Sequence, residues 1–303
     1  MAHRFPITLT QLGYFAECAK TLNMTVASQE LHVAQSAVST AISHLEKALG
    51  ASLFIRQHAK GLILTAAGEK LLRDTHQIFG LLSESIETIR ADHDEVRGSV
   101  TVACFKTLAP FLLPPLIGRL QQRHPELEVE YLEGDYEETL SALRSGRAEI
   151  AVTYRFAEVE GIDSALVGEV PPHVVLPADH RFAGRESIAL AELSDEPLVL
   201  LDLPDSREYF LDLLRRGGLD PRPRYRTSSY ETVRSMVATG LGYSILNQRP
   251  RIVGSYTGGS VATVEISDRL PALEIAVSSL SQVTLSARSR AVAAGVRDII
   301  TES

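Results

Sequence analysis

Residues 35–49 carry the clearest pattern of hydrophobic and polar positions in the chain. Apolar side chains recur there with helical spacing, at Val38, Ala41, Ile42, Leu45 and Leu49, which predicts a helix with one buried stripe. The opposite face is small and polar, and its members are Gln35, Ser36, Ser39, Thr40, Ser43 and His44. Short hydrogen-bonding side chains fit the major groove of DNA, so these residues are candidate DNA-binding residues.

Neighbouring segments complete a predicted winged helix-turn-helix. A shorter helix is expected from Thr25 to Leu31, and residues 32–34 are long enough for the turn between the two helices. Residues 8–20 predict a first helix, with Thr8 or Thr10 as its N-cap.

Residues 54–64 predict a β-hairpin wing after the long helix. Arg56 and Lys60 flank a turn that contains Gly61. A hairpin tip can lie along the sugar-phosphate backbone, so both cations are candidate phosphate contacts. The alternative is that they are solvated surface charges.

A long helix without proline is expected over residues 66–96. Leu71, Ile78, Leu82 and Ile89 follow one another at intervals of seven and four, which is the spacing of a coiled-coil seam. One chain cannot bury such a seam alone, so we expect a second copy of this helix as its partner. The alternative is a helix that packs on its own domain.

From Gly98 onward the pattern changes to alternating strands and helices. Strands are expected near residues 99–104, 127–133 and 149–153, and helices between them, which predicts a parallel sheet with right-handed crossovers. A second run covers residues 162–267, and the chain then returns to the first. The predicted units are therefore 1–65 (head), 66–97 (linker helix and hinge) and 98–303, the last with one lobe at 98–161 and 268–303 and another at 162–267.

These residues resemble the LysR-type transcriptional regulators. The resemblance is carried by Ala27, Leu31, Gln35, Ser36, Ala37, Val38, Ser39, Ile42, Leu45, Glu46, Leu49, Gly50, Leu53, Phe54, Arg56, Leu64, Thr65 and Gly68. The chain departs from the family at Val26 and Thr40. The resemblance implies an α/β fold with an α-rich winged helix-turn-helix head, a linker helix and a two-lobe effector domain like that of periplasmic binding proteins. It also implies promoter DNA as a partner, a small-molecule effector and a homodimer or homotetramer, with RNA polymerase as a further candidate partner.

Candidate effector-binding residues lie at the carboxyl ends of the predicted strands, where helix N-termini bind ligands in open α/β sheets. They are Phe105, Lys106, Thr107, Gly134, Asp135, Tyr154, Ser206, Ser229 and Tyr230. The hydroxyl residues have a plainer alternative as N-caps. Several helix N-termini and the charge of Lys106 predict a polar or anionic metabolite, while Asp135 suggests that the ligand also presents an amine or amide.

The charge distribution confines DNA contact to one end of the chain. The net charge is −8, yet residues 1–65 hold five basic and three acidic residues, a net +2, and the remainder holds 25 basic and 35 acidic residues, a net −10. A weakly basic head on an acidic body needs several heads acting together for tight DNA binding.

Other classes of protein find less support in the sequence. There is no export signal and no apolar run long enough for a membrane span, so a cytoplasmic protein is expected and a transporter's solute-binding protein is not. No catalytic, metal or cofactor motif is present. Cys104 beside Lys106 leaves a redox-responsive regulator of the same fold as an alternative, although the only other cysteine, Cys18, is far away in sequence.

Overall fold

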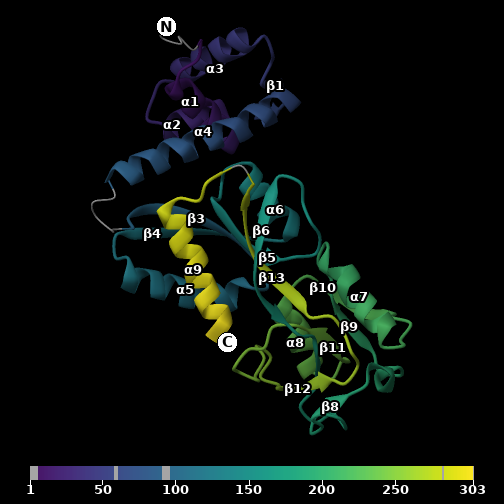
Figure 1. Ribbon diagram of the computed structural model, residues 1–303. Helices are drawn as coiled ribbons and strands as arrows, with labels where there is room; N and C mark the ends of the chain where they lie inside the picture. Colours follow the sequence, from purple (N-terminus) through teal and green to yellow (C-terminus); the bar gives the residue numbers. More distant parts are fainter. Residues whose placement is uncertain (1–5, 58–60, 91–95, 282, 303) are drawn as a thin grey trace.

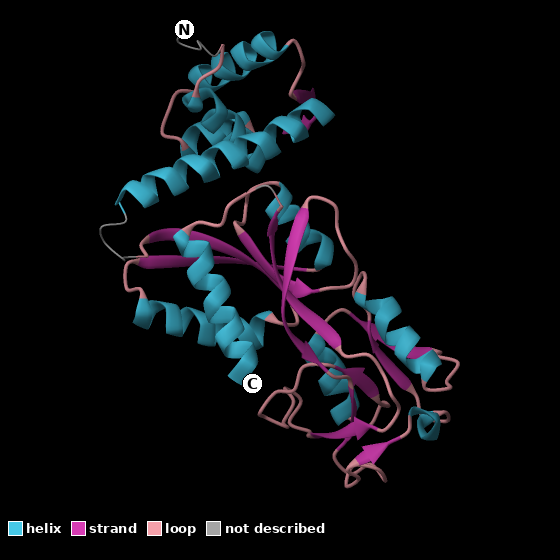
Figure 2. Cartoon of the chain, viewed as in Figure 1, coloured by secondary structure: helices cyan, strands magenta, loops and turns pink. Residues whose placement is uncertain are grey.

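The chain forms a small helical head above a larger α/β body (Figure 1). The computed structural model describes residues 6–57, 61–90, 96–281 and 283–302, and for residues 56, 57, 83–85 and 87–90 it describes the backbone alone. Helices dominate the head, and most of the strands lie in the body (Figure 2).

The head is the predicted helix-turn-helix with its wing. Its elements are α1 (Leu9–Thr21), α2 (Met24–Glu30), α3 (Gln35–Leu49), β1 (Phe54–Gln57) and β2 (Gly61–Leu64), and the two strands pair antiparallel. Thr8 is the N-cap of α1, because its hydroxyl accepts a hydrogen bond from the backbone N–H of Gln11. The core of the head is built around Phe15, Ile42 and Leu45, all fully buried.

Two contacts attach the wing to the helices. The carboxylate of Glu46, on α3, accepts hydrogen bonds from the backbone N–H groups of Leu53 at 2.8 Å and Phe54 at 3.4 Å. At Gly68 a β-carbon would lie 2.2 Å from the Leu53 carbonyl oxygen, so only glycine allows helix α4 (Ala66–Arg90) to begin this close to the base of the wing. The position of α3 therefore determines that of the wing and of α4.

The body begins with a five-stranded sheet, which with its helices we call lobe I. The strand order is β4 (Leu127–Gly134), β3 (Gly98–Phe105), β5 (Ile150–Tyr154), β13 (Leu273–Leu280) and β6 (Ile162–Val170). β3 is parallel to β4 and β5, as predicted, whereas β13 is antiparallel to β5 and β6. Helices α5 (Ala109–Arg123) and α9 (Ala287–Glu302) pack together, whereas α6 (Tyr136–Arg144) lies apart from them, to their upper right in Figure 1, and packs on β3 and β5.

The remaining strands and helices form lobe II. One sheet has the order β11 (Ser244–Leu246), β7 (His173–Pro177), β12 (Val261–Ile266) and β8 (Ser187–Ile188), and β10 (Pro223–Thr227) pairs in parallel with β9 (Leu198–Leu201). Helices α7 (Ser206–Arg216) and α8 (Tyr230–Ala238) and the short 3-10 helix η1 (Leu190–Leu193) complete the lobe. One continuous set of buried side chains joins the two lobes.

The crossover between the lobes lies later than the sequence pattern placed it. Residues 162–170 were assigned to the second lobe, but they form β6, which pairs along its length with β13 in the sheet of lobe I. Residues 162–177 contain two strands, β6 and β7, which lie on different sheets. The physical reason is a pairing partner more than one hundred residues away, which local periodicity does not reveal.

Candidate DNA interface and effector cavity

The recognition face of α3 has the predicted polarity. Val38, Ala41, Ile42 and Leu45 are buried, and the side chains of Gln35, Ser36, Thr40, Ser43 and His44 are exposed, with Ser39 half-buried. Leu49 was expected in the buried stripe, but it is 44% exposed, because it lies in the last turn of the helix beyond the head's core. Gln35 and Ser39 lie one turn apart at the N-terminal end of the helix. Within the described chain no side chain caps this end at Ala34.

The predicted phosphate contacts fall at the edge of what the structure describes. The backbone of Arg56 lies in β1, opposite Leu62 of β2. Its side chain and the whole of Lys60 lie outside the described residues, so the assignment of both to phosphate contact stays a prediction.

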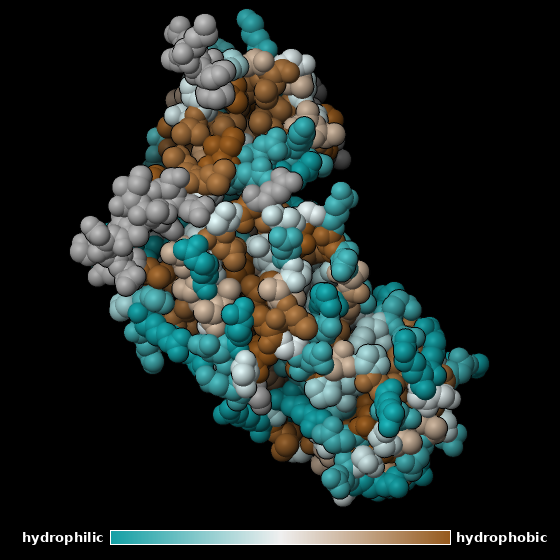
Figure 3. Space-filling view, viewed as in Figure 1, coloured by the Kyte–Doolittle hydropathy of each residue, from teal (hydrophilic) through white to brown (hydrophobic). Residues whose placement is uncertain are grey.

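Helix α4 presents a row of apolar side chains to solvent. Ile78 is 39% exposed and Leu82 is 40% exposed, and Leu81 and Ile86 are exposed nearby. Leu71, the first residue of the predicted seam, is half-buried against the core of the head. Ile89 lies in the helix, but its side chain is outside the described residues. The face drawn in Figure 3 shows hydrophobic surface gathered on the head, whereas lobe II is largely hydrophilic there.

A small cavity lies between the two lobes. Lobe I contributes Phe105, Thr107, Tyr154 and Leu273, and lobe II contributes Leu201, Leu203, Ser206, Phe210, Tyr230, Leu246, Asn247 and Gln248. The cavity measures about 10 Å³, which is room for about one water molecule. A larger molecule can therefore bind there only if the lobes separate or if the lining side chains move.

The structure brings together some of the predicted effector-binding residues. Those that line the cavity are Phe105, Thr107, Tyr154, Ser206 and Tyr230, and those that lie outside its lining are Lys106, Gly134, Asp135 and Ser229. Asp135 and Ser229 act as the N-caps of α6 and α8, accepting hydrogen bonds from the backbone N–H groups of Glu138 and Thr232. Gly134 accepts the backbone N–H of Lys106 through its carbonyl oxygen. Among the hydroxyl residues, the N-cap alternative therefore describes Ser229.

Sequence reasoning missed the polar side chains of Asn247 and Gln248. Both follow β11 directly, so the rule that found Tyr154 at the end of β5 applies to them equally. Gln248 links the lobes, because its side-chain amide donates a hydrogen bond to the hydroxyl of Tyr154 in lobe I at 3.2 Å. Within lobe II, its backbone carbonyl oxygen accepts a hydrogen bond from the Tyr230 hydroxyl at 2.5 Å. The ring of Tyr230 also meets Phe111 of lobe I edge-on, with centroids 5.8 Å apart.

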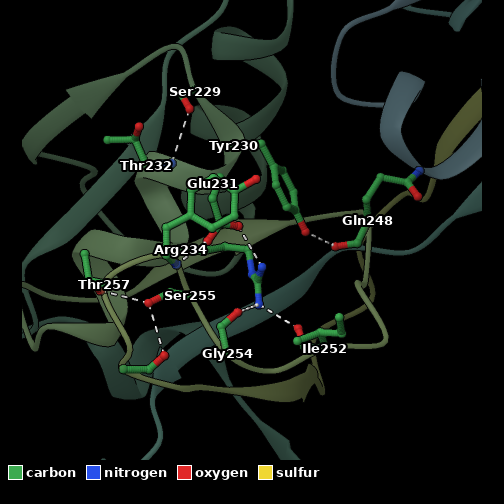
Figure 4. Close-up of polar contacts among 12 residues, drawn as sticks. Ser229, Tyr230, Glu231, Thr232, Arg234, Gln248, Ile252, Gly254, Ser255 and Thr257 are labelled. Carbon is green, nitrogen blue, oxygen red and sulfur yellow. Dashed lines mark hydrogen bonds and ion pairs between the residues drawn. The ribbon is translucent and has the colours of Figure 1, made fainter.

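A buried arginine holds the loop beside α8 (Figure 4). Arg234 is 6% exposed; it pairs with Glu231 at 2.7 Å and donates hydrogen bonds to the carbonyl oxygens of Ile252 and Gly254. Glu231 accepts the backbone N–H of Tyr256 at 3.2 Å. The N-terminal turn of α8 thus joins the cavity, through Tyr230, to the loop at 252–256.

The surroundings of the cavity disfavour charge. Burial raises the pKa of Tyr154 and of Tyr209 to about 12, and it also raises the pKa of Tyr230. Among the described residues that line the cavity, none carries a formal charge. An ion bound there would need a charge partner from outside the lining.

Both cysteines are buried and free. Burial, followed by the charge of Glu17, raises the pKa of Cys18 to about 11, and burial, followed by the charge of Glu133, raises the pKa of Cys104 to about 12. Since the thiolate is the reactive form, neither group is activated.

Two features are absent from the described ranges of the chain. No helix there has the length and apolar character to cross a membrane. No three His, Cys, Asp or Glu side chains there are grouped so that they would hold a metal ion.

The chain matches known proteins along almost its whole length. The family model described as "Bacterial regulatory helix-turn-helix protein, lysR family" matches residues 9–69, and the "LysR substrate binding domain" matches residues 93–299. The transcriptional regulator YvbU of Bacillus subtilis is 29% identical over 284 residues, covering 93% of this chain and 96% of that protein. A hydrogen peroxide-inducible genes activator of Dickeya chrysanthemi is 28% identical over 241 residues, or 79% of each chain.

A solved structure extends the similarity to the arrangement of head and body. A full-length OxyR variant from Pseudomonas aeruginosa, with a cysteine replaced by aspartate, has a TM-score of 0.81 and 25% identity, and 97% of each chain is covered. The family models account for both the DNA-reading head and the two-lobe body. The chain belongs to the LysR family of transcriptional regulators, which bind DNA through a helix-turn-helix, carry an effector-binding domain and are not enzymes.

Proposed function

We propose that this protein is a sequence-specific transcriptional regulator that a small polar molecule switches by binding between lobes I and II. The observation that carries the proposal is the cavity to which both lobes contribute side chains, among them Tyr154 of lobe I and Tyr230 of lobe II. A ligand that enters there exchanges the Gln248 hydrogen bonds for its own and so favours a different separation of the lobes. The ligand changes the affinity for DNA only to the extent that it binds one arrangement of the lobes more tightly than the other.

The effector is polar and uncharged or cationic rather than anionic. An anion was expected from the helix N-termini and Lys106, but Lys106 lies outside the lining of the cavity. The first turns of α6, α7 and α8 also carry the acidic residues Glu137, Glu138, Glu208 and Glu231. These carboxylates offset the positive ends of the helix dipoles.

The regulator acts as an oligomer on promoter DNA in the cytoplasm. Leu82 and Ile78 of α4 pair with the same residues of a second copy, and two dimers form the homotetramer that the family resemblance implies. Oligomerisation supplies the additional heads that a weakly basic head needs. RNA polymerase is the partner at the promoter when the regulator activates transcription.

A redox-responsive regulator is the second candidate, since relatives include a hydrogen peroxide-inducible genes activator. Both cysteines of this chain are buried with raised pKa values, which opposes reaction with peroxide. The test is operator binding before and after hydrogen peroxide, with wild type and Cys104→Ala. We expect the same affinity in all four measurements; a peroxide effect that Cys104→Ala abolishes would establish the redox candidate instead.

The proposed function itself is tested in two steps. Purified protein first selects its operator from a pool of random DNA, and a reporter driven by that operator is then measured in cells supplied with single nitrogen or carbon sources. We expect one class of nutrient to change the reporter several-fold. The change should disappear in Tyr230→Ala and persist in Tyr256→Ala, whose tyrosine is 92% exposed outside the cavity. A response that survives Tyr230→Ala would place the signal elsewhere.

A further inference from the structure

The walls of the inter-lobe cavity combine aromatic rings with neutral polar groups. Phe105 and Tyr154 meet edge-on at 5.2 Å between centroids. Phe210 and Tyr230 are the aromatic residues that lobe II contributes to the lining. Aromatic faces attract cations and repel anions, because their π-electrons carry partial negative charge.

Asn247 offers this cavity a hydrogen-bond acceptor. Its side-chain amide nitrogen donates to the Val170 carbonyl oxygen and to the Tyr209 hydroxyl, both at 2.9 Å. A carbonyl oxygen only accepts, so the contact with Val170 fixes which end of the amide is the nitrogen. The amide oxygen is then buried, and it has no hydrogen-bond partner in the described part of the chain. Asn247 as a whole is 7% exposed.

Two of the donors around the cavity are engaged within the protein. The Tyr230 hydroxyl donates to the Gln248 carbonyl oxygen, and the Gln248 amide donates to the Tyr154 hydroxyl. A carboxylate or phosphate would need several such donors. The open position is an acceptor, which selects a ligand that donates.

Carboxylates from both lobes gather beside the cavity. Asp205 is the N-cap residue of α7, directly before the lining residue Ser206. Burial raises the pKa of Asp205, and so do the charges of Glu137, in the first turn of α6, and of its N-cap Asp135. The nearby Arg207 is already paired with Asp202. The potential at this edge of the cavity therefore favours a cation.

We infer that the effector carries a positively charged amine on a small apolar or aromatic body. The amine N–H donates to the Asn247 amide oxygen, the rings of Tyr154 and Tyr230 take up the apolar body, and Asp205 supplies counter-charge from the edge. This inference rests on the proposed function, whose site it uses. It makes Asn247 and Asp205 the residues that determine ligand specificity.

The test uses three probes that share one ring and differ in the charge of the attached group: benzylamine, benzyl alcohol and benzoate. Thermal unfolding of the full-length protein is followed at pH 7 with each probe at the same concentration. We expect benzylamine to raise the apparent melting temperature by about 2–4 °C when it is well above its dissociation constant. Benzyl alcohol should have a smaller effect, and benzoate none. A larger effect of benzoate, or no effect of benzylamine, overturns the inference.

Matched variants locate the site. Asn247→Leu removes the acceptor, and Asp205→Asn removes one charge while keeping a residue type that accepts the positive φ of 65° at this position. Both should weaken the benzylamine effect at least threefold in apparent affinity, whereas the exposed Asp195→Asn should not. If Asn247→Leu does not fold, the comparison of Asp205→Asn with Asp195→Asn decides whether benzylamine binds at this cavity.

A second pocket provides the control for non-specific binding of an amine. It measures about 270 Å³ on the outer side of α8, where Glu231 and Tyr256 also combine a carboxylate with an aromatic ring. If Tyr256→Ala, and not Asp205→Asn, abolishes the benzylamine effect, the inference is wrong. Binding to the selected operator is measured in parallel. A loss of operator binding would refute the proposed function, but it would not refute the charge preference of the cavity.

Discussion

The ring of His76, on helix α4, packs directly against Gly146, in the turn between α6 and β5 of lobe I. A β-carbon at position 146 would lie 2.0 Å from Nε2 of His76, which is too close for any other residue. Gly80 approaches the same lobe one turn later, where its β-carbon would meet Val283 at 3.2 Å. Burial lowers the pKa of His76, so the ring is neutral at pH 7. The helix that carries the head is thereby attached to the effector domain.

Gly146→Ala should detach α4 from lobe I. Gly161→Ala is the matched control, because Gly161 has a similar positive φ (78° against 66°) while nothing in the described chain lies within 4 Å of its β-carbon position. Both substitutions carry about 1–2 kcal/mol of backbone strain, and only the first adds a clash with His76. Hydrogen exchange of residues 72–80 is the measurement, and it should quicken in Gly146→Ala alone.

Removing the ring should relieve the clash. The double variant Gly146→Ala with His76→Ala is expected to exchange more slowly over residues 72–80 than Gly146→Ala does. Equal exchange in Gly146→Ala and Gly161→Ala would show that α4 does not rest on lobe I in solution.

Leu82→Glu should break the oligomer. The substitution places a charge on the exposed apolar row of α4, where we expect the second copy. Sedimentation at micromolar concentration should change from an oligomer to the 33.1 kDa chain, and operator binding should be lost with it. Leu241→Glu is the control, since Leu241 is 39% exposed and Leu82 is 40% exposed. A wild-type protein that sediments as a monomer would contradict the account.

Gln35→Ala should reduce the recognition of one DNA sequence over others. Glutamine pairs with adenine through two hydrogen bonds, so the loss on the selected operator is expected to be about 1–3 kcal/mol, with little change on random DNA. Gln122→Ala, on the exposed face of α5, should change neither. By contrast, Arg56→Ala should weaken both kinds of DNA about equally and flatten the salt dependence. Fluorescence anisotropy at several salt concentrations gives all of these values.

The body should lose stability on acidification because of His173. This side chain is 1% exposed in β7, and burial, with a smaller effect of the Arg249 charge, lowers its pKa to about 3. The unfolded chain binds a proton at His173 below about pH 6.5, while the folded chain does not. Stability is therefore highest above that pH and falls by up to about 1.4 kcal/mol per pH unit between about 6.5 and 3.

Urea unfolding at pH 7 and pH 5 measures this loss. His173→Gln should reduce the difference between the two pH values, and His124→Gln, at a half-buried position outside the strands, should leave it unchanged. The same pH difference in wild type and His173→Gln would assign it to other groups.

The local pattern of hydrophobic and polar residues was sufficient to predict the head, but it was not sufficient to predict which residues line the cavity. The stripe of Val38, Ile42 and Leu45 predicted α3 and its exposed face correctly, because both follow from the helical repeat alone. Lys106 was grouped with its neighbours Phe105 and Thr107, yet only the neighbours line the cavity. β3 ends at Phe105, and Lys106 and Thr107 lie in the turn before α5, where adjacency in sequence does not determine which side chains reach the cavity.

Long-range pairing explains the remaining differences. The assignment of β6 to lobe I depends on β13, and the cavity depends on how Gln248, after β11, meets Tyr154, the last residue of β5. No periodicity within either segment contains that information. The acidic edge formed by Asp205 and Asp135 is likewise a product of the approach of two lobes.

The central claim is that a ligand between the lobes controls DNA binding at the head. The most direct test is the affinity of full-length protein for its selected operator, measured by anisotropy with and without saturating benzylamine, in wild type and in Asp205→Asn. We expect benzylamine to change the wild-type operator affinity at least fivefold and to need at least threefold higher concentration to do so in Asp205→Asn. An operator affinity that stays constant while benzylamine demonstrably occupies the cavity would contradict the account.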